Sequence, residues 1–195
     1  MGLLETAGRG CRTGRSYSFP KRVTYFDYEG EAAIVIGKRG KNIPAEQVRH
    51  YVWDVTLFHD WSIRDGGGTD RPVSYNLQKN FDGAASMGPC IVVGELDSQN
   101  VDVETWVNEG VRQRYNTREM VWSFDEVLEF LSQDFTFVPG DVIGGGTSAG
   151  TAADQSRRSE GKRPLDLFLK IGDVVEVSSP QIGALSNRIV INESE

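Results

Sequence analysis

Short runs of β-branched and aromatic residues, separated by glycine, constrain the fold of this chain more than any other feature. Runs of this kind predict strands, and the chain's 22 glycines supply turns between them. The runs are residues 23–28, 32–37, 52–61, 88–94, 101–107, 111–115, 167–169, 174–177 and 188–191. A chain with so many short strands has to build most of its core from sheet.

A clear helical pattern occurs once. Ser123 and Glu126 form a capping box, and the apolar residues that follow recur at helical spacing through Leu131. A shorter helix is expected from Pro44 to about His50, because proline suits the start of a helix. Helices and strands do not alternate regularly, so the sequence predicts an α+β fold with a dominant sheet rather than a doubly wound one.

The chain's 195 residues fit one domain, and 38% apolar content is enough for a core. Residues 1–20 show no periodicity and are expected to be a disordered or remnant N-terminal arm, which leaves 21–195 as the domain. No window approaches the roughly 20 apolar residues of a spanning helix, and the first residues do not resemble a secretory signal. Cys11 and Cys90 suggest no disulfide framework, so the sequence predicts a cytoplasmic protein.

Charge and histidine content exclude several functions. The formal net charge is −7 and the basic residues are scattered, which argues against a nucleic-acid groove or an anionic membrane surface. With two histidines, a His-rich zinc site is excluded. A metal would therefore have to be a hard cation held by oxygen ligands.

Carboxylates alternate where one predicted strand begins. Asp27, Glu29 and Glu31 share a face if the strand is regular, so they must be paired, metal-bound or at an open rim. The alternative is an exposed acidic strand end. Asp60 ends the next apolar run and would bring a third oxygen ligand beside Glu29 and Glu31. Together these three would leave about three positions on an octahedral Mg²⁺ or Mn²⁺ for water or substrate.

Two cations are candidate partners for these carboxylates. Arg64 lies four residues after Asp60, and Lys79 follows a loop rich in glycine and proline. Arg64 could hold Asp60 or a substrate carboxylate, while for each of the two the alternative that general exposure favours is a solvated surface cation. His59 should face away from Asp60 on a regular strand and is expected to be structural. The glycine-rich run at 144–150 offers backbone N–H groups to an anion, although it lacks the ending of a P-loop.

These residues converge on a resemblance to the C-terminal domain of the fumarylacetoacetate hydrolase superfamily, which includes 2-hydroxyhepta-2,4-diene-1,7-dioate isomerases and acylpyruvate hydrolases. The matching segments cover nearly everything from Tyr28 onward. They are YEGEAAIVIGKRGKNIPAEQV (28–48), FHDWSIRD (58–65), LQKNFDGAASMGPCIVV (77–93), NTREMVWSFDEVLEFLS (116–132), PGDVIGGGTSAG (139–150) and GDVVEVSSPQIGALSNRIV (172–190).

The resemblance implies a rolled, barrel-like mixed β-sheet with a few short helices, binding Mg²⁺ or Mn²⁺ at its mouth. The family's metal carboxylates fall on Glu29, Glu31 and Asp60, its substrate-facing arginine on Arg64, its active-site lysine on Lys79 and its loop threonine on Thr147. Family substrates are small 2-oxo or 1,3-dioxo acids. Their hydrolysis, isomerisation or decarboxylation passes through a metal-stabilised enolate, and several members serve aromatic catabolism.

One departure from the family pattern leaves two functions open. Catalytic members carry a general-base His on an N-terminal lid, and no His precedes His50 here. The chain is therefore expected to be a hydrolase, isomerase or decarboxylase of weak activity, or a truncated relative that binds metal and oxo acid without turnover. A plain structural β domain is the third alternative. The resemblance also implies a homodimer, and the apolar strand 135–137 is expected to be exposed for such a contact.

Overall fold

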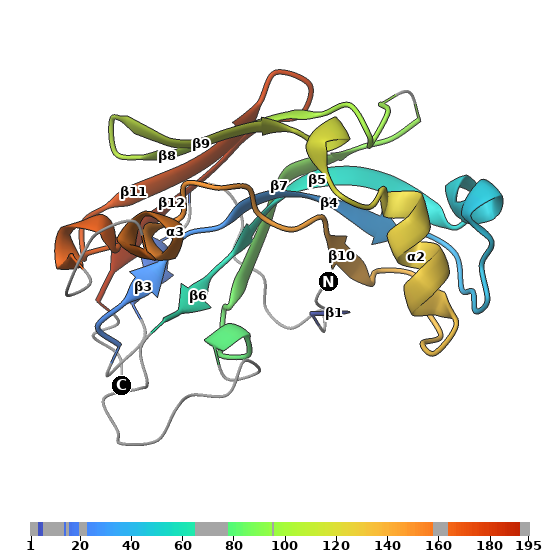
Figure 1. The fold of residues 1–195 in the computed structure, drawn as a ribbon, viewed down its shortest axis with the longest axis horizontal. Coiled ribbons are helices and arrows are strands. Elements are labelled where there is room, and N and C mark those ends of the chain that lie inside the picture. Colours follow the sequence, from blue (N-terminus) through green and yellow to red (C-terminus); the bar gives the residue numbers. More distant parts are fainter. Residues whose placement is uncertain are drawn as a thin grey trace.

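Two five-stranded sheets lie face to face in the computed structural model, which describes residues 4–5, 14, 16–19, 23–64, 78–94, 96–157 and 164–191 (Figure 1). In spatial order, the first sheet contains β1 (Leu4–Glu5), β10 (Val142–Gly144), β4 (Gly30–Ile36), β5 (Val52–Asp60) and β7 (Ala85–Val92). The second contains β2 (Ser16–Ser18), β12 (Gly183–Val190), β11 (Val174–Ser179), β8 (Asp102–Val107) and β9 (Gly110–Asn116). A separate pair joins β3 (Phe26–Asp27) to β6 (Ser62–Ile63). Strands pair antiparallel except β2 with β12, so the second sheet is mixed, as the family resemblance implies, while the first is antiparallel.

Short helices lie at the edges of these sheets. They are η1 (Ala45–His50), η2 (Thr117–Glu119), α2 (Phe124–Ser132), α3 (Ala152–Arg157) and η3 (Leu165–Leu167). The capping box of α2 is confirmed, because Ser123 and Glu126 bond each other's backbone N–H groups. The α+β fold is therefore confirmed. None of the helices in the described ranges is long and apolar enough to cross a membrane.

Two local predictions are wrong in the C-terminal half. The strand expected at 167–169 does not form: η3, with Pro164 as its N-cap residue, ends at Leu167, and the next two residues belong to no strand or helix. Three apolar residues carry too little periodicity to separate a strand from a helical turn. The sequence predicts no helix at residues 152–157, where α3 forms with Ala152 and Ser156 buried and Arg157 exposed.

A hydrophobic core cluster, aliphatic for the most part, contains side chains from both sheets and from α2. It includes Ile34 and Leu57 from the first sheet, Val177 and Leu185 from the second, and Phe124 from α2. A second, aromatic cluster surrounds the β3–β6 pair, where Tyr17, Phe26 and Trp61 stack with ring centroids 4.7–5.6 Å apart.

Two expectations about exposure differ from the structure. Within residues 1–20, Ser16–Ser18 form a strand of the second sheet and Tyr17 is buried, rather than belonging to an arm. One apolar residue between serines gives no periodic signal. Most of the remaining arm lies outside the described residues, so its division from the domain stays a prediction. Phe137 is buried and its backbone bonds to Gly40, which leaves Phe135 as the half-exposed side chain of that strand.

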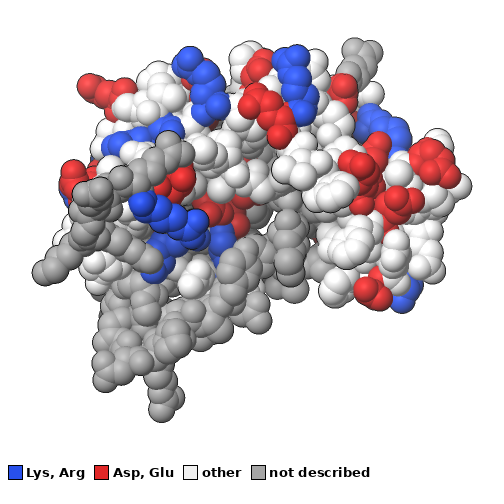
Figure 2. Space-filling view, viewed as in Figure 1, with Lys and Arg blue, Asp and Glu red and all other residues white. Residues whose placement is uncertain are grey.

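The surface carries both signs of charge. Figure 2 shows Lys and Arg side chains interspersed with Asp and Glu side chains over the face seen in Figure 1. Near the centre of that face, acidic and basic atoms lie directly against one another.

Candidate metal centre and substrate site

Strand register places three carboxylates on one face of the first sheet. In the antiparallel β4–β5 pair, Glu31 lies opposite Phe58, and the Asp60 N–H donates to the Glu29 carbonyl at 3.0 Å. Opposed residues share a face, and so do residues two apart. Glu29, Glu31 and Asp60 therefore project the same way, and the pairing of β4 with β5, extended by the bond between Asp60 and Glu29, brings them together.

The three carboxylates are close and buried. Oxygens from Glu29, Glu31 and Asp60 lie within 4.8 Å of one another, and each residue is at most 8% exposed. The alternative of an exposed acidic strand end is therefore wrong. Grouping like charges out of water is costly unless cations balance them.

Lys79 supplies one such cation. Its Nζ donates to Glu29 Oε2 at 2.5 Å, to Ser62 Oγ at 2.6 Å and to Asp60 Oδ2. The residue is 2% exposed, so it is not the solvated surface cation that general exposure patterns favour. Lys79 thus lies inside the carboxylate group and is bonded to two of its three members.

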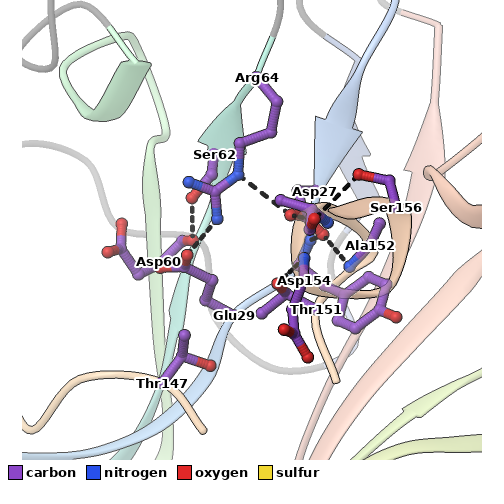
Figure 3. Close-up of polar contacts among 12 residues, drawn as sticks. Asp27, Glu29, Asp60, Ser62, Arg64, Thr147, Thr151, Ala152, Asp154 and Ser156 are labelled. Carbon is purple, nitrogen blue, oxygen red and sulfur yellow. Dashed lines mark hydrogen bonds and ion pairs between the residues drawn. The ribbon is translucent and has the colours of Figure 1, made fainter. Parts of the chain in front are cut away.

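Arg64 joins the same group from the end of β6 (Figure 3). Its Nε donates to Asp27 Oδ2 at 3.0 Å, and its terminal nitrogen donates to Glu29 Oε1. Asp27 also accepts the N–H groups of Ala152 and Ala153, the first two residues of α3, at 2.8 and 3.0 Å. Strand geometry is interrupted between Asp27 and Gly30, so Asp27 anchors the arginine and α3 instead of lying beside Glu29 and Glu31.

Burial and neighbouring charges shift the acidities within this group. Burial holds the pKa of Glu31 well above its usual value, with Asp60 and Glu29 adding to the increase. Burial also raises the pKa of Asp60 to about 6 against the opposing effect of Lys79. For Glu29, burial is outweighed by Lys79 and Arg64, so the net pKa is lowered. Burial alone would lower the pKa of Lys79, but Asp60 and Glu29 raise it overall.

A glycine-rich loop after β10 closes one side of the group. The Gly146 N–H donates to Glu31 Oε2 at 2.9 Å, and a Cβ at Gly144 would lie 2.6 Å from that same oxygen. Thr147 follows directly and is half-buried, in the loop that passes below Glu29 in Figure 3. The loop also borders a cavity of about 400 Å³, lined by Tyr115, Glu119, Met120, Val121, Trp122, Val127 and residues 144–149.

Two side chains from β9 support this site, and sequence reasoning missed both. Tyr115 accepts the Ala32 N–H at 3.1 Å and donates to the Gly30 carbonyl at 3.3 Å. Gln113 accepts the Gly30 N–H at 3.1 Å and donates to the Thr147 hydroxyl. These bonds satisfy backbone groups of β4 on both sides of Glu31, in the part of β4 that no longer pairs with β10. The two residues lie two apart on β9, so their side chains are expected to share a face. Nothing in the sequence, however, indicates that this face packs against β4.

His59 lies outside the site, as expected. It sits opposite Gly30 on the face toward the second sheet, fully buried, and its ring stacks on Trp61 at 4.4 Å. Burial lowers the pKa of His59 to about 3. It is a neutral side chain of the interior.

The donor set fits a hard divalent cation. Mg²⁺ and Mn²⁺ prefer oxygen ligands, and three carboxylates converge here with no sulfur or imidazole among them. Asp60 Oδ1 is buried and accepts no hydrogen bond within the described part of the chain. A buried carboxylate oxygen without a donor is the kind of atom that a cation would satisfy.

The fold and the carboxylate group together define a mixed β-sheet protein built around a buried acidic site. The family model described as fumarylacetoacetate (FAA) hydrolase C-terminal matches residues 11–190. The chain belongs to the fumarylacetoacetate hydrolase family. The family resemblance seen in the sequence is thereby confirmed.

Known relatives agree with this assignment. An uncharacterised protein of Staphylococcus epidermidis is 39% identical over 192 residues, which is 96% of this chain and 60% of that protein. A solved 5-carboxymethyl-2-hydroxymuconate delta-isomerase from Mycobacterium smegmatis is 30% identical with a TM-score of 0.77, covering 94% of this chain and 66% of that one. A 2-hydroxyhepta-2,4-diene-1,7-dioate isomerase from Mycobacterium marinum is 28% identical with a TM-score of 0.78 and the same coverage. The chain spans about three fifths of the length of its staphylococcal relatives.

Proposed function

We propose that this protein is a divalent-metal-dependent enzyme that acts on small 2-oxo or 1,3-dioxo carboxylic acids through an enolate. Glu29, Glu31 and Asp60 would hold Mg²⁺ or Mn²⁺, while Arg64, Lys79 and Thr147 would meet the substrate. The observation that carries the proposal is the convergence of three buried carboxylates with one buried ammonium group. The names of the two solved isomerases given above specify 2-hydroxy unsaturated acids, which are the enol forms of 2-oxo acids.

Formation of an enolate would place negative charge on a substrate oxygen, and the site would have to stabilise that charge. A bound divalent cation supplies Lewis-acid stabilisation of such charge. The Lys79 ammonium donates its three hydrogens to Glu29, Asp60 and Ser62, so it would stabilise the same developing charge through its own positive charge, from a fixed position. Its bonds to both carboxylates hold it in place before any substrate arrives.

Substrate orientation would come from the two sides of the site. Asp27 fixes the Arg64 guanidinium on one side, where it would receive a substrate carboxylate in a planar fork. Thr147 and the glycine-rich loop lie on the other side, next to a cavity large enough for the non-reacting part of a small acid. The burial of Glu31, Asp60 and Lys79 restricts water in between, which strengthens these electrostatic contacts.

Assaying oxaloacetate decarboxylation and acylpyruvate cleavage side by side, with Mg²⁺ or Mn²⁺ present, tests the proposal. We expect turnover of at least one substrate and its loss by about 10²-fold or more in Glu29→Gln, because a metal-holding carboxylate is removed. Glu46→Gln is the matched control, since Glu46 is exposed on η1. Turnover unchanged in Glu29→Gln, or oxo-acid binding without any turnover, would contradict the enzymatic proposal.

A further inference from the structure

Gln113 is a buried side chain that connects the two halves of the proposed site. It lies on β9 in the second sheet and is 2% exposed. Its amide accepts the Gly30 N–H at 3.1 Å, between Glu29 and Glu31 on β4. The same amide donates to the Ser148 carbonyl at 2.9 Å and to the Thr147 hydroxyl oxygen at 2.6 Å.

Two of these partners determine which end of the amide is which. A backbone N–H only donates, so the atom facing Gly30 has to be the carbonyl oxygen of the amide. A backbone carbonyl only accepts, so the atom facing Ser148 has to be the amide nitrogen. A flipped amide would place two acceptors together and two donors together inside a buried site. The orientation of Gln113 is therefore fixed by the backbone.

This orientation fixes the polarity of Thr147. The Gln113 nitrogen carries two hydrogens, and one of them points to Thr147 Oγ1. The hydroxyl oxygen thus accepts from Gln113, and its own hydrogen has to point elsewhere. A hydroxyl whose oxygen accepts a hydrogen bond from one partner can donate its own hydrogen only to a different partner.

We infer that Gln113 is a positioning residue that makes Thr147 a hydrogen-bond donor toward a substrate carboxylate. The inference rests on the proposed function and deepens it, because it selects ligands that accept at this position. Hydrogen bonds also fix the position of the glycine-rich loop relative to β4. Gly146 donates to Glu31 next to Thr147, while Gln113 ties Thr147 to Gly30, so the loop is held to β4 at two adjacent points.

A double-mutant cycle tests the inference with oxalate as the probe, since its adjacent carboxylate oxygens chelate a metal and accept hydrogen bonds. Gln113→Glu keeps an acceptor for Gly30 but presents only acceptors to Thr147, so the hydroxyl hydrogen turns toward residue 113. Thr147→Val removes the hydroxyl and keeps the shape. The dissociation constant of oxalate is measured by calorimetry at saturating Mn²⁺ for the wild type, both single variants and the double variant.

We expect each single variant to weaken oxalate binding by about tenfold or more, the usual effect of losing a hydrogen bond to a charged group. In the Thr147→Val background, Gln113→Glu should then weaken binding by at least about threefold less than it does in the wild type, because only the repulsion between the added charge and oxalate remains. The added charge repels oxalate equally in both backgrounds, so it cancels in the cycle. Thr147→Ser, which keeps a hydroxyl, should bind oxalate within about threefold of the wild type.

Equal losses from Gln113→Glu in both backgrounds would overturn the inference while leaving the proposed function intact. Failure of the wild type to bind oxalate at saturating Mn²⁺ would instead overturn both. Thermal unfolding of each variant shows whether it is folded. If Gln113→Glu does not fold, Gln113→Met takes its place in the cycle. Gln113→Met should weaken oxalate binding less than Gln113→Glu does, because it frees the Thr147 hydroxyl instead of turning its hydrogen away from the ligand. This loss should also disappear in the Thr147→Val background.

Discussion

The Lys79 ammonium and the carboxylates around it depend on one another for stability as well as for chemistry. Its charge is buried, and it bonds to Glu29, Asp60 and Ser62. The Glu31 carboxylate relies instead on the Gly146 N–H, and its pKa is raised chiefly by burial. Each charge in such a group is tolerated because a specific partner lies within bonding distance.

Lys79→Met removes the buried cation but preserves the length and bulk of the side chain. We expect the free energy of unfolding, measured in urea with EDTA present, to fall by about 3 kcal/mol, since breaking a buried pair leaves charge uncompensated. Adding Mn²⁺ should restore much of this loss, because a divalent cation would take over the charge balance. The sequence alone places Lys79 at a ligand and does not reveal this structural contribution.

Lys41→Met provides the matched control, because Lys41 is exposed next to a turn. Its unfolding free energy should stay within about 0.5 kcal/mol of the wild type. Equal small effects from both lysine variants would show that the Lys79 bonds contribute nothing to stability.

At the scale of elements, the close approach of β4 to the second sheet determines where the site forms. A Cβ at Gly30 would lie 1.9 Å from Thr105 Oγ1 on β8 and 2.9 Å from Val177 Cγ2 on β11. Glycine therefore lets β4 press against the second sheet on one face while Glu29 and Glu31 project from the other. It also brings β4 within reach of Gln113 and Tyr115.

Gly30→Ala should destabilise the protein by about 3 kcal/mol, because the added methyl group overpacks the contact between the sheets. Chemical denaturation followed by circular dichroism measures this loss. Adding Thr105→Ala should recover part of it, since Thr105 Oγ1 is the nearest atom and is buried without a hydrogen-bond partner in the described chain. A double variant no more stable than Gly30→Ala would show that the strain lies elsewhere.

Elements with a strong local signal could be predicted from the sequence, and so could the acidic site. The period of two along a strand puts Glu29 and Glu31 on one face, and the end of the next apolar run supplies Asp60. Gln113, Tyr115 and the anchoring role of Asp27 depend on contacts between segments more than 80 residues apart in sequence. Those contacts follow from how the two sheets stack, and a local pattern contains no information about that.

At the scale of the whole molecule, apolar side chains near α2 remain exposed. Val121 is 87% exposed, Trp122 63% and Phe130 71%. Exposed apolar area of this kind is typical of surfaces that meet another protein. With the family resemblance, it supports a homodimer.

Light scattering at micromolar concentrations should therefore give about twice the 21.6 kDa mass of one chain. Trp122→Glu should shift the mass toward a single chain, because a charge would be buried in the contact. Trp53→Glu is the control, since Trp53 is a comparably exposed tryptophan on β5. A single-chain mass for the wild type at every concentration would rule out the dimer, and dissociation by Trp53→Glu alone would place its contact elsewhere.

The central claim is that Glu29, Glu31 and Asp60 form one binding site for a divalent cation, and Mn²⁺ titration followed by electron paramagnetic resonance tests it most directly. The free-ion signal should fall with a stoichiometry of one ion per chain in the wild type. In Glu31→Gln the affinity should drop by at least about tenfold, because a charged ligand is replaced by a neutral one. Wild-type protein that leaves the free Mn²⁺ signal unchanged, or a Glu31→Gln variant that binds Mn²⁺ equally well, would contradict the claim.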